Sequence, residues 1–300
     1  MQDLLAYDFF RNALWSTLLV GIACGLTGTY IVARRMVFIS GGITHASFGG
    51  LGLAYFLGLS PMLGAGAFAL LAAFCILRLS AGRHFKEDSL IGIFWSAGMA
   101  AGVLFIYLTP GYAPNLLSYL FGNILTVTDG QVWLSLAFCA LIVLFFARYH
   151  RPLFYIAFDR DFCLAQHLPV ARLETAITIL VALCIVLCMK LAGIILVISY
   201  MTVPPAIAGL FHKDFKRQLL LSSAVSCIGS VGGLLLSALL DLPSGATIVC
   251  GFLAILVTCR AGKYIATRAR RENPGGWPGW PDLHNRGSTT HGKTASYTSA

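Results

Sequence analysis

Nine apolar stretches, each near the length that crosses a lipid bilayer as a helix, follow one another along this chain and limit what it can fold into. A transmembrane helix needs about 20 apolar residues, and only helices satisfy every backbone group in lipid over such lengths. The sequence therefore predicts an all-α, polytopic membrane helical bundle of about 8–9 transmembrane helices. The predicted spans are 12–33, 40–58, 61–80, 89–109, 130–148, 173–190, 192–211, 219–240 and 244–261. Little more than Ser60-Pro61 separates the second from the third, which leaves open that one of them is re-entrant or broken.

The composition agrees with insertion in a membrane. Of 300 residues, 58% are hydrophobic and only 11% charged, against about 25% charged in a typical soluble domain. The net charge of +9 comes from Lys and Arg in short segments between the apolar runs, which excludes a nucleic-acid-binding face. Basic loops lie on the cytoplasmic side of inserted proteins, so we expect a multi-pass protein with its carboxyl terminus in the cytoplasm.

The last part of the chain differs from the rest. We assign residues 1–262 to a transmembrane domain and 263–300 to a cytoplasmic tail that is first basic and then, from Glu272, rich in Pro, Gly, Ser and Thr and expected to be disordered. The tail holds a literal G-x-x-x-x-G-K-[ST] match from Gly287 to Thr294. A phosphate-binding loop needs a strand before it and a helix after it, and neither is predicted here. The chain is therefore not expected to carry an ATPase site of its own.

His45 is the only histidine inside a predicted span, in the segment RRMVFISGGITHASFGGLGL at 34–53. Imidazole suits zinc and other late transition metals, and ionisable groups inside membranes are functional candidates. Two interpretations stay open: a metal ligand on a transport path, or a group that hydrogen-bonds between helices.

Cysteines occur nine times, mostly within the apolar runs, and the sequence has no C-x-x-C. Cys184 and Cys188 are four residues apart and share a helix face. We favour ordinary packing of these thiols over a soft-metal site.

A predicted cytoplasmic segment at 159–174, DRDFCLAQHLPVARLE, has a short helical pattern that ends at Pro169. Phe162, Leu164, Ala165 and Leu168 give it an apolar face. It is either an interfacial helix or a docking helix for a cytosolic partner.

Pro204 and Pro205 lie within the span LAGIILVISYMTVPPAIAG at 191–209. Proline removes a backbone donor, so the pair predicts a kink or break in this helix. Carbonyls freed near Thr202 must then line a cavity or find neighbouring partners. A purely structural kink is the alternative.

Together these segments resemble the ABC-3 family of metal permeases, the membrane subunits of zinc and manganese ATP-binding-cassette importers. The resemblance covers about residues 10–262. It depends on five segments in order: RRM…HASFGGLGL, KED…IGI at 86–93, YLFGNIL at 119–125, D-x-x-x-A-x-x-x-P-V from Asp161 to Val170, and AGIILVISYMTVPPAIA.

The resemblance implies a permease subunit in a prokaryotic inner membrane. Such a subunit moves a divalent transition metal, zinc above all, by alternating access, with ATP bound on a partner and no cofactor of its own. Its implied partners are cytosolic ATPase subunits, an extracytoplasmic metal-binding protein and a second copy of the permease. His45 matches a histidine of the family's metal path, and Thr202, Pro204 and Pro205 are expected to line that path. The implied ATPase-coupling residues are Asp159, Asp161, Phe162, Ala165, Pro169 and Val170.

The sequence departs from the family pattern at two positions. Many members carry Asp four residues before the histidine, where this chain has Gly41, which argues most against manganese because that ion prefers carboxylate. The coupling segment usually has Gly where this chain has His167, so its helix must end without the residue that most easily turns left-handed.

Two other functions remain as alternatives. One is the same machinery carrying manganese, iron or a chelated metal. The other is an ion-gradient-driven secondary transporter, which would be expected to hold several carboxylates within the membrane. No acidic residue lies centrally in a predicted span.

Overall fold

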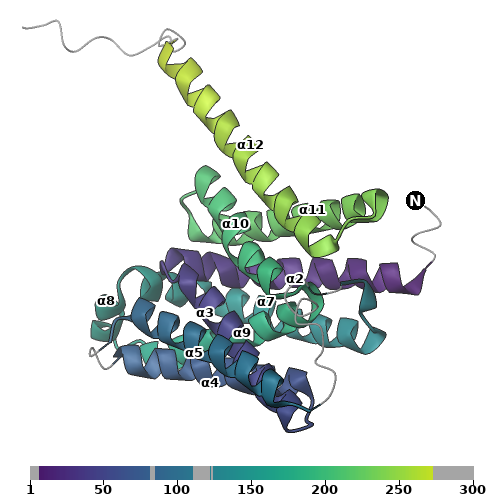
Figure 1. Ribbon diagram of the computed structural model, residues 1–300. Coiled ribbons are helices and arrows are strands. Elements are labelled where there is room, and N and C mark those ends of the chain that lie inside the picture. Colours follow the sequence, from purple (N-terminus) through teal and green to yellow (C-terminus); the bar gives the residue numbers. More distant parts are fainter. Residues whose placement is uncertain (1–6, 82–84, 111–121, 123, 273–300) are drawn as a thin grey trace, which may run out of the picture. The chain divides into compact units, whose positions relative to one another are not determined.

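The computed structural model describes residues 7–81, 85–110, 122 and 124–272, and every regular element in these residues is a helix (Figure 1). The predicted disordered stretch at 273–300, and part of the 119–125 segment, lie outside them. Nine helices are long: α2 (Asp8–Ala33), α3 (Val37–Phe56), α4 (Pro61–Ala81), α5 (Glu87–Leu108), α7 (Asp129–Phe158), α9 (Val170–Ala192), α10 (Ile194–Phe211), α11 (Phe215–Leu240) and α12 (Ser244–Glu272). Two are short, η1 (Ile124–Thr126) and α8 (Arg160–Ala165).

Each of the nine long helices has the length and apolar character of a membrane span. The all-α bundle and the nine predicted spans are confirmed. Helices α3 and α4 have 20 and 21 residues, and at about 1.5 Å per residue each covers about 30 Å, the thickness of the hydrocarbon core. Neither is shortened or interrupted, so the re-entrant alternative for residues 40–80 is not observed.

Helix α7 is longer than predicted. The prediction ends this span at residue 148, but the helix continues through Pro152 to Phe158. Tyr149, Leu153 and Ile156 explain the extension, because they recur at helical spacing and pack into the hydrophobic clusters of the protein. The extended helix brings the chain directly to the segment at 159–174.

A tight turn connects α2 to α3. The N–H of Arg35 donates to Val32 O and the N–H of Met36 donates to Ile31 O, both at 3.0 Å. Arg35 adopts a positive φ of 60°, as the residue after a helix often does. This cap ends α2, reverses the chain, and leaves Arg34 and Arg35 at one end of the bundle.

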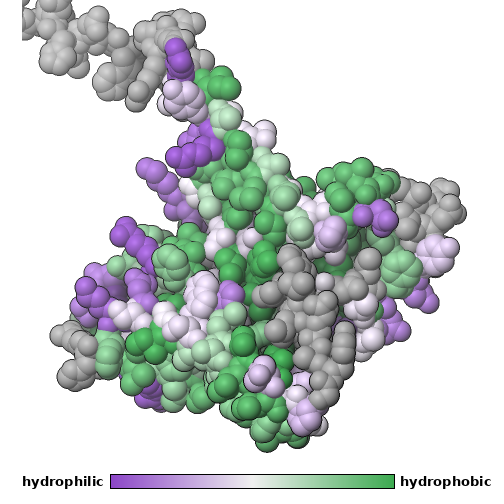
Figure 2. Space-filling view, viewed as in Figure 1, coloured by the Kyte–Doolittle hydropathy of each residue, from purple (hydrophilic) through white to green (hydrophobic). Residues whose placement is uncertain are grey.

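Helices α2 and α3 form the centre of the bundle. Buried residues make up 72% and 78% of their apolar windows, against 22% for α7. Helix α2 packs against α7, α9, α10 and α11, and α3 packs against α4, α5, α9 and α10. Hydrophobic side chains cover much of the visible surface (Figure 2), as expected where lipid is the solvent.

Helices α3 and α5 meet almost backbone to backbone. A Cβ atom placed on Gly52 would lie 2.5 Å from the carbonyl oxygen of Gly102, and one on Gly98 would lie 2.4 Å from Cα of Ala46. Small residues permit this approach between membrane helices. The contact brings the side chains of α5 next to His45.

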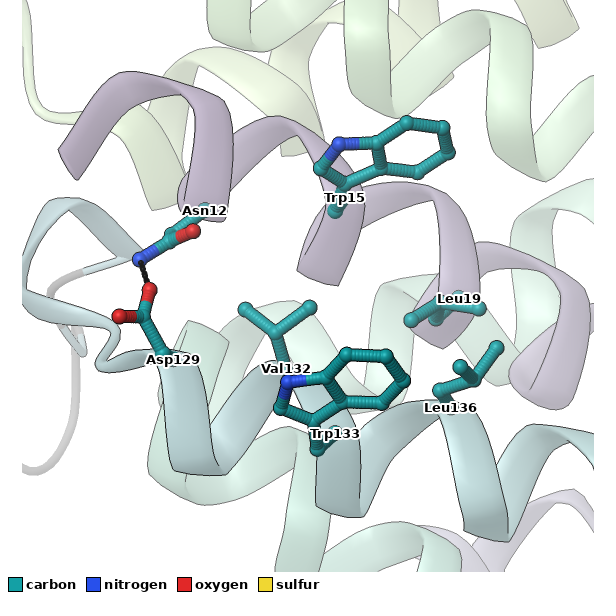
Figure 3. Close-up of a pocket in the computed structure, with 7 residues that line it drawn as sticks. All are labelled: Asn12, Trp15, Leu19, Asp129, Val132, Trp133 and Leu136. Atoms are coloured by element: carbon teal, nitrogen blue, oxygen red, sulfur yellow. Dashed lines mark hydrogen bonds between the residues drawn. The ribbon is translucent and has the colours of Figure 1, made fainter. Parts of the chain in front are cut away.

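Two tryptophans mark the end of the bundle at which α2 and α7 begin. Trp15 and Trp133 are exposed and line a pocket of about 390 Å³ (Figure 3). Beside them, Asn12 Nδ2 donates to Asp129 Oδ1 at 2.6 Å. Tryptophan gathers where membranes meet water, so this end of the two helices is placed at a membrane surface.

The described residues up to Cys259 form one compact unit, and those from Arg260 onward belong to a second; the boundary at residue 262 stays a prediction. In the second unit the described residues are those of the basic end of α12, up to Glu272. All candidate functional residues lie in the first unit.

Candidate functional site

His45 lies on α3, half-buried, between two side chains of α5. Its ring stacks on the indole of Trp95, with 4.3 Å between the ring centroids and 12° between the planes. Its Nδ1 lies 3.3 Å from Sδ of Met99, one helical turn after Trp95. When Nδ1 carries the hydrogen and donates it to this sulfur, Nε2 keeps the lone pair that a metal would need.

Trp95 also occupies the space beside Gly41, where the family pattern leads us to expect a carboxylate. A Cβ atom on Gly41 would lie 2.9 Å from Cζ3 of the indole. A side chain at position 41 would therefore force the ring to move. Gly41, where an acidic residue is expected, and Trp95 beside it therefore form one arrangement.

The polar atoms at this place are the imidazole nitrogens of His45 and the sulfur of Met99. In the described part of the chain, one group of three or more His, Cys, Asp or Glu side chains lies close enough together to hold a metal ion. His45 does not belong to that group. The contact between His45 on α3 and Met99 on α5 agrees with the alternative interpretation, in which His45 forms a hydrogen bond between helices. A metal-binding role for His45 stays a prediction.

The sequence predicts a kink or break at the prolines of α10, and no break is observed. Helix α10 runs without interruption from Ile194 to Phe211 through Pro204 and Pro205, and both prolines are buried. Since proline has no N–H, the carbonyls of Tyr200 and Met201 lack their usual helical donors.

The backbone of α2 packs closely against the carbonyl of Met201. A Cβ atom on Gly28 would lie 2.5 Å from Met201 O, so the absence of a side chain lets the backbone of α2 approach the carbonyl. Thr202, half-buried, turns its hydroxyl back to Ile198 O at 2.8 Å. The two prolines are therefore accommodated in a closely packed part of the bundle. That Thr202, Pro204 and Pro205 line a transport path stays a prediction.

The predicted coupling segment contains the short helix α8, which follows directly on α7. Asp159 caps its start, because Oδ1 accepts a hydrogen bond from the N–H of Phe162 at 2.9 Å. Its end is closed by two bonds, His167 N–H to Leu164 O at 3.0 Å and Leu168 N–H to Cys163 O at 3.1 Å. His167 takes the left-handed conformation there, with a φ of 57°, although it lacks the freedom of glycine.

The residues of this segment separate into an anchored set and an exposed set. Cys163 and Val170 are buried in a small cluster with Ile156 and Leu173. The exposed residues include Asp161, Phe162, Leu164, Ala165 and Pro169. Phe162 exposes 54% of its surface, so the segment presents an aromatic ring outward from a fixed base.

Glu174 joins this segment to the centre of the bundle. Its side chain is only 7% exposed, and Oε1 accepts from Arg34 Nη1 at 2.8 Å and from Arg160 Nε at 3.1 Å. Arg34 lies at the end of α2 and Arg160 in the first turn of α8. One carboxylate therefore links α2, α8 and α9.

The arginine at the end of α2 is held in its charged form. Burial acts to lower the pKa of Arg34, but the interactions with Tyr30 and Glu174 outweigh it and raise the pKa above its usual range. Arg34, Arg160, Glu174 and Glu87 line a polar pocket of about 270 Å³.

Sequence reasoning missed several of these residues. A single acidic residue near the start of an otherwise apolar span was the signal for Glu174, but its two partners lie 140 and 14 residues away in sequence. The spacing of Trp95 and Met99, four residues apart, placed them on one helix face, but nothing in the sequence joined that face to His45.

The fold and this site define a multi-pass α-helical membrane protein with a short helix fixed at one end of the bundle. Its sequence matches the ABC 3 transport family over residues 6–262. The chain belongs to that family.

Relatives cover most of the chain. An uncharacterized membrane protein of Synechocystis, slr2045, is 39% identical over 249 residues, which are 83% of this chain and 89% of that protein. The manganese transport system membrane protein MntC of Halalkalibacterium halodurans is 32% identical, over 83% of this chain and 85% of its own. The manganese import system permease protein ScaB of Streptococcus gordonii is also 32% identical, over 83% of this chain and 89% of its own.

A solved structure, PsaBC from Streptococcus pneumoniae in complex with Fab, has a chain that superimposes with a TM-score of 0.76 at 30% identity. The match covers 86% of this chain and 93% of that chain. An inward-facing putative metal-chelate type ABC transporter, at 16% identity and a TM-score of 0.71, shares the fold.

Proposed function

We propose that this chain is the membrane-spanning permease subunit of an ATP-binding-cassette importer for a divalent transition metal. The observation that carries the proposal is helix α8 within a chain of the ABC 3 transport family. An exposed helix fixed to α2 and α9 by Glu174 is suited to receive a push from outside the membrane and pass it to the spans.

The proposed partners follow from this arrangement. Cytosolic ATPase subunits hold the ATP and dock on Asp161, Phe162 and Ala165, while Asp159 and Val170 fix the helix. A metal-binding protein delivers the cargo on the opposite side, and a second permease copy completes the pathway. The basic turn at Arg34-Arg35 and helix α8 then face the cytoplasm of a prokaryotic cell, as does the carboxyl terminus.

Zinc is the cargo that we propose. His45 Nε2 offers an imidazole nitrogen, and the side chain beside Nδ1 is the thioether of Met99 rather than an oxygen donor. Manganese prefers carboxylate, carbonyl and water, and Trp95 occupies the place of the expected carboxylate. Two relatives named for manganese transport make that ion the second candidate.

The assignment is tested by uptake into vesicles that contain the permease and its ATPase, with zinc offered against manganese and iron. We expect zinc to compete best and the His45→Ala variant to lose uptake while still forming a folded dimer. His150→Ala, a substitution of a histidine near the end of α7, is the matched control and should transport normally. Normal uptake by His45→Ala would remove His45 from the path.

Docking is tested separately. Alanine at Asp161 and at Phe162 should weaken binding of the ATPase subunit, because both side chains are exposed on α8. Unchanged assembly and transport by these variants would reject the coupling role of the segment.

A further inference from the structure

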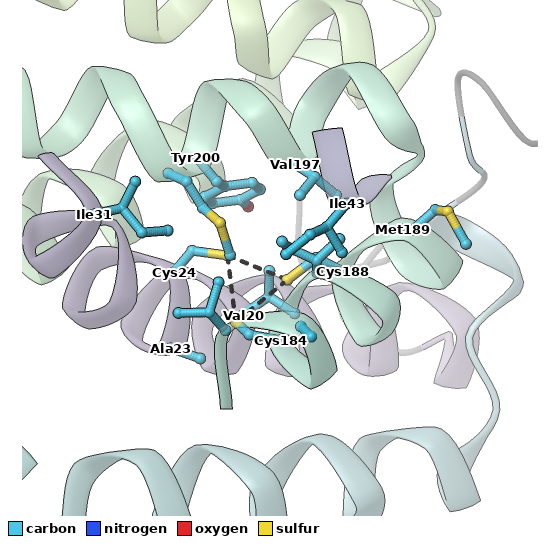
Figure 4. Packing of buried hydrophobic residues seen from close by; sticks show 14 of the residues in the cluster. Val20, Ala23, Cys24, Ile31, Ile43, Cys184, Cys188, Met189, Val197 and Tyr200 are labelled. Carbon is cyan, nitrogen blue, oxygen red and sulfur yellow. Dashed lines mark hydrogen bonds between the residues drawn. The ribbon is translucent and has the colours of Figure 1, made fainter. Parts of the chain in front are cut away.

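Three thiols from two helices converge inside the bundle, beside Tyr200 of α10 (Figure 4). Cys24 comes from α2, and Cys184 and Cys188 come from successive turns of α9. The Sγ atom of Cys24 lies 3.1 Å from that of Cys188 and 3.9 Å from that of Cys184, and the two α9 sulfurs are 4.0 Å apart. All three side chains are fully buried.

The triangle of sulfurs has the size that a bound cation requires. A zinc ion lies about 2.3 Å from each thiolate, which keeps the sulfurs about 3.8 Å apart in tetrahedral and about 4.0 Å apart in trigonal geometry. Two of the three edges already have these lengths, and the third needs to open by less than an ångström.

The surroundings restrict what enters this space. Apolar side chains of Val20, Ile43 and Val197 belong to the same buried cluster. Thr27 is a polar neighbour: its hydroxyl donates to Ala23 O at 2.8 Å, and its oxygen lies 3.8 Å from Cys184 Sγ. The thiolate is the form that binds metal, so a bound cation must displace the thiol protons.

We propose that Cys24, Cys184 and Cys188 form a binding site for a thiophilic divalent cation of the zinc group, Zn²⁺ or Cd²⁺. Binding releases three thiol protons and leaves one net negative charge around a divalent ion. A monovalent copper ion would leave two, at greater cost within a membrane. The site joins α2 to α9 at a second place besides Glu174. It does not depend on the proposed transport function.

The test is titration of the purified full-length permease in lipid nanodiscs with Cd²⁺. Thiolate ligation produces an ultraviolet sulfur-to-cadmium charge-transfer band, and we expect it to saturate at one cation per chain and to raise the melting temperature. With Zn²⁺ bound, X-ray absorption should show zinc–sulfur distances of about 2.3 Å.

Matched variants assign the band. Cys24→Ser and the triple serine variant should lose it, while Cys139→Ser, at a cysteine that is also buried, should keep it. His45→Ala should keep it too, which separates this site from the candidate transport path. Circular dichroism and gel filtration of each variant establish that it is folded.

Three results would overturn the proposal: no band in the folded wild-type chain, a band that persists in the folded triple variant, or formation of a Cys24–Cys188 disulfide in place of cation binding. These outcomes leave the transport proposal untouched. Conversely, if the wild-type permease with its ATPase shows the cadmium band but transports no metal, the proposed transport function is rejected and the thiol site stands.

Discussion

Replacing Glu174 by Gln should destabilise the protein by about 3 kcal/mol. The substitution keeps the shape of the side chain and removes its charge, so Arg34 is left charged at a site where only 20% of its side chain is exposed. Breaking a buried ion pair by removing one partner costs about 3–5 kcal/mol. The low end applies because the glutamine carbonyl still accepts one hydrogen bond.

The second arginine adds little to this value. Arg160 is 45% exposed and can turn to water, and ion pairs of that exposure contribute about 0–1 kcal/mol. Most of the effect should therefore vanish in the double variant Glu174→Gln with Arg34→Met, in which neither a buried charge nor its partner remains.

The assay is reversible unfolding of the detergent-solubilised permease, with the four proteins of this double-mutant cycle compared. Asp214→Asn is the control, because the Asp214–Arg217 pair is 3.7 Å long and exposed on both sides, and asparagine still caps α11. A loss below about 0.5 kcal/mol for Glu174→Gln, the size of an ordinary surface substitution, would refute a structural role for the buried carboxylate.

Three further substitutions test the candidate sites. Gly41→Asp should shift uptake toward manganese, since the new carboxylate displaces Trp95 and stands beside His45; an unchanged zinc-to-manganese ratio in competition uptake would contradict this. His167→Gly should relieve about 1 kcal/mol of left-handed strain and slow hydrogen exchange of the α8 amides about fivefold; equal or faster exchange would show that His167 is unstrained. Phe162→Ala should weaken ATPase binding about tenfold, the effect of losing one well-buried contact, measured by surface plasmon resonance; an unaltered affinity would place the ring outside the interface.

Trp133→Ala is the matched control for Phe162→Ala. It also removes an exposed aromatic ring, but one near the start of α7, at the opposite end of that helix from α8. We expect it to leave ATPase affinity unchanged.

The spans could be predicted from the sequence because lipid imposes a simple rule on length and polarity. The same rule misplaced the end of α7, since Arg148 and Arg151 resemble the start of a loop, while Leu153 and Ile156 beyond them bury against neighbouring helices. Likewise, Pro204 and Pro205 predict a break when the helix is considered alone. The approach of Gly28 to Met201 O comes from another helix, and no local pattern reveals it.

Part of the candidate site could be singled out from the sequence, but the residues around it and their arrangement could not. His45 and the segment at 159–174 stand out by residue type and position. The stacking of Trp95 on His45, the position of Glu174 between Arg34 and Arg160, and the meeting of Cys24 with the two cysteines of α9 all join distant parts of the chain. These contacts depend on tertiary packing, and local sequence patterns do not show which distant residues will meet.

The source of energy tests the central claim most directly. Vesicles holding the permease with its ATPase should take up zinc only when ATP is supplied, and ionophores that abolish proton and sodium gradients should leave that uptake intact. Uptake by the permease alone, without ATP and abolished by the same ionophores, would show a secondary transporter and contradict the account.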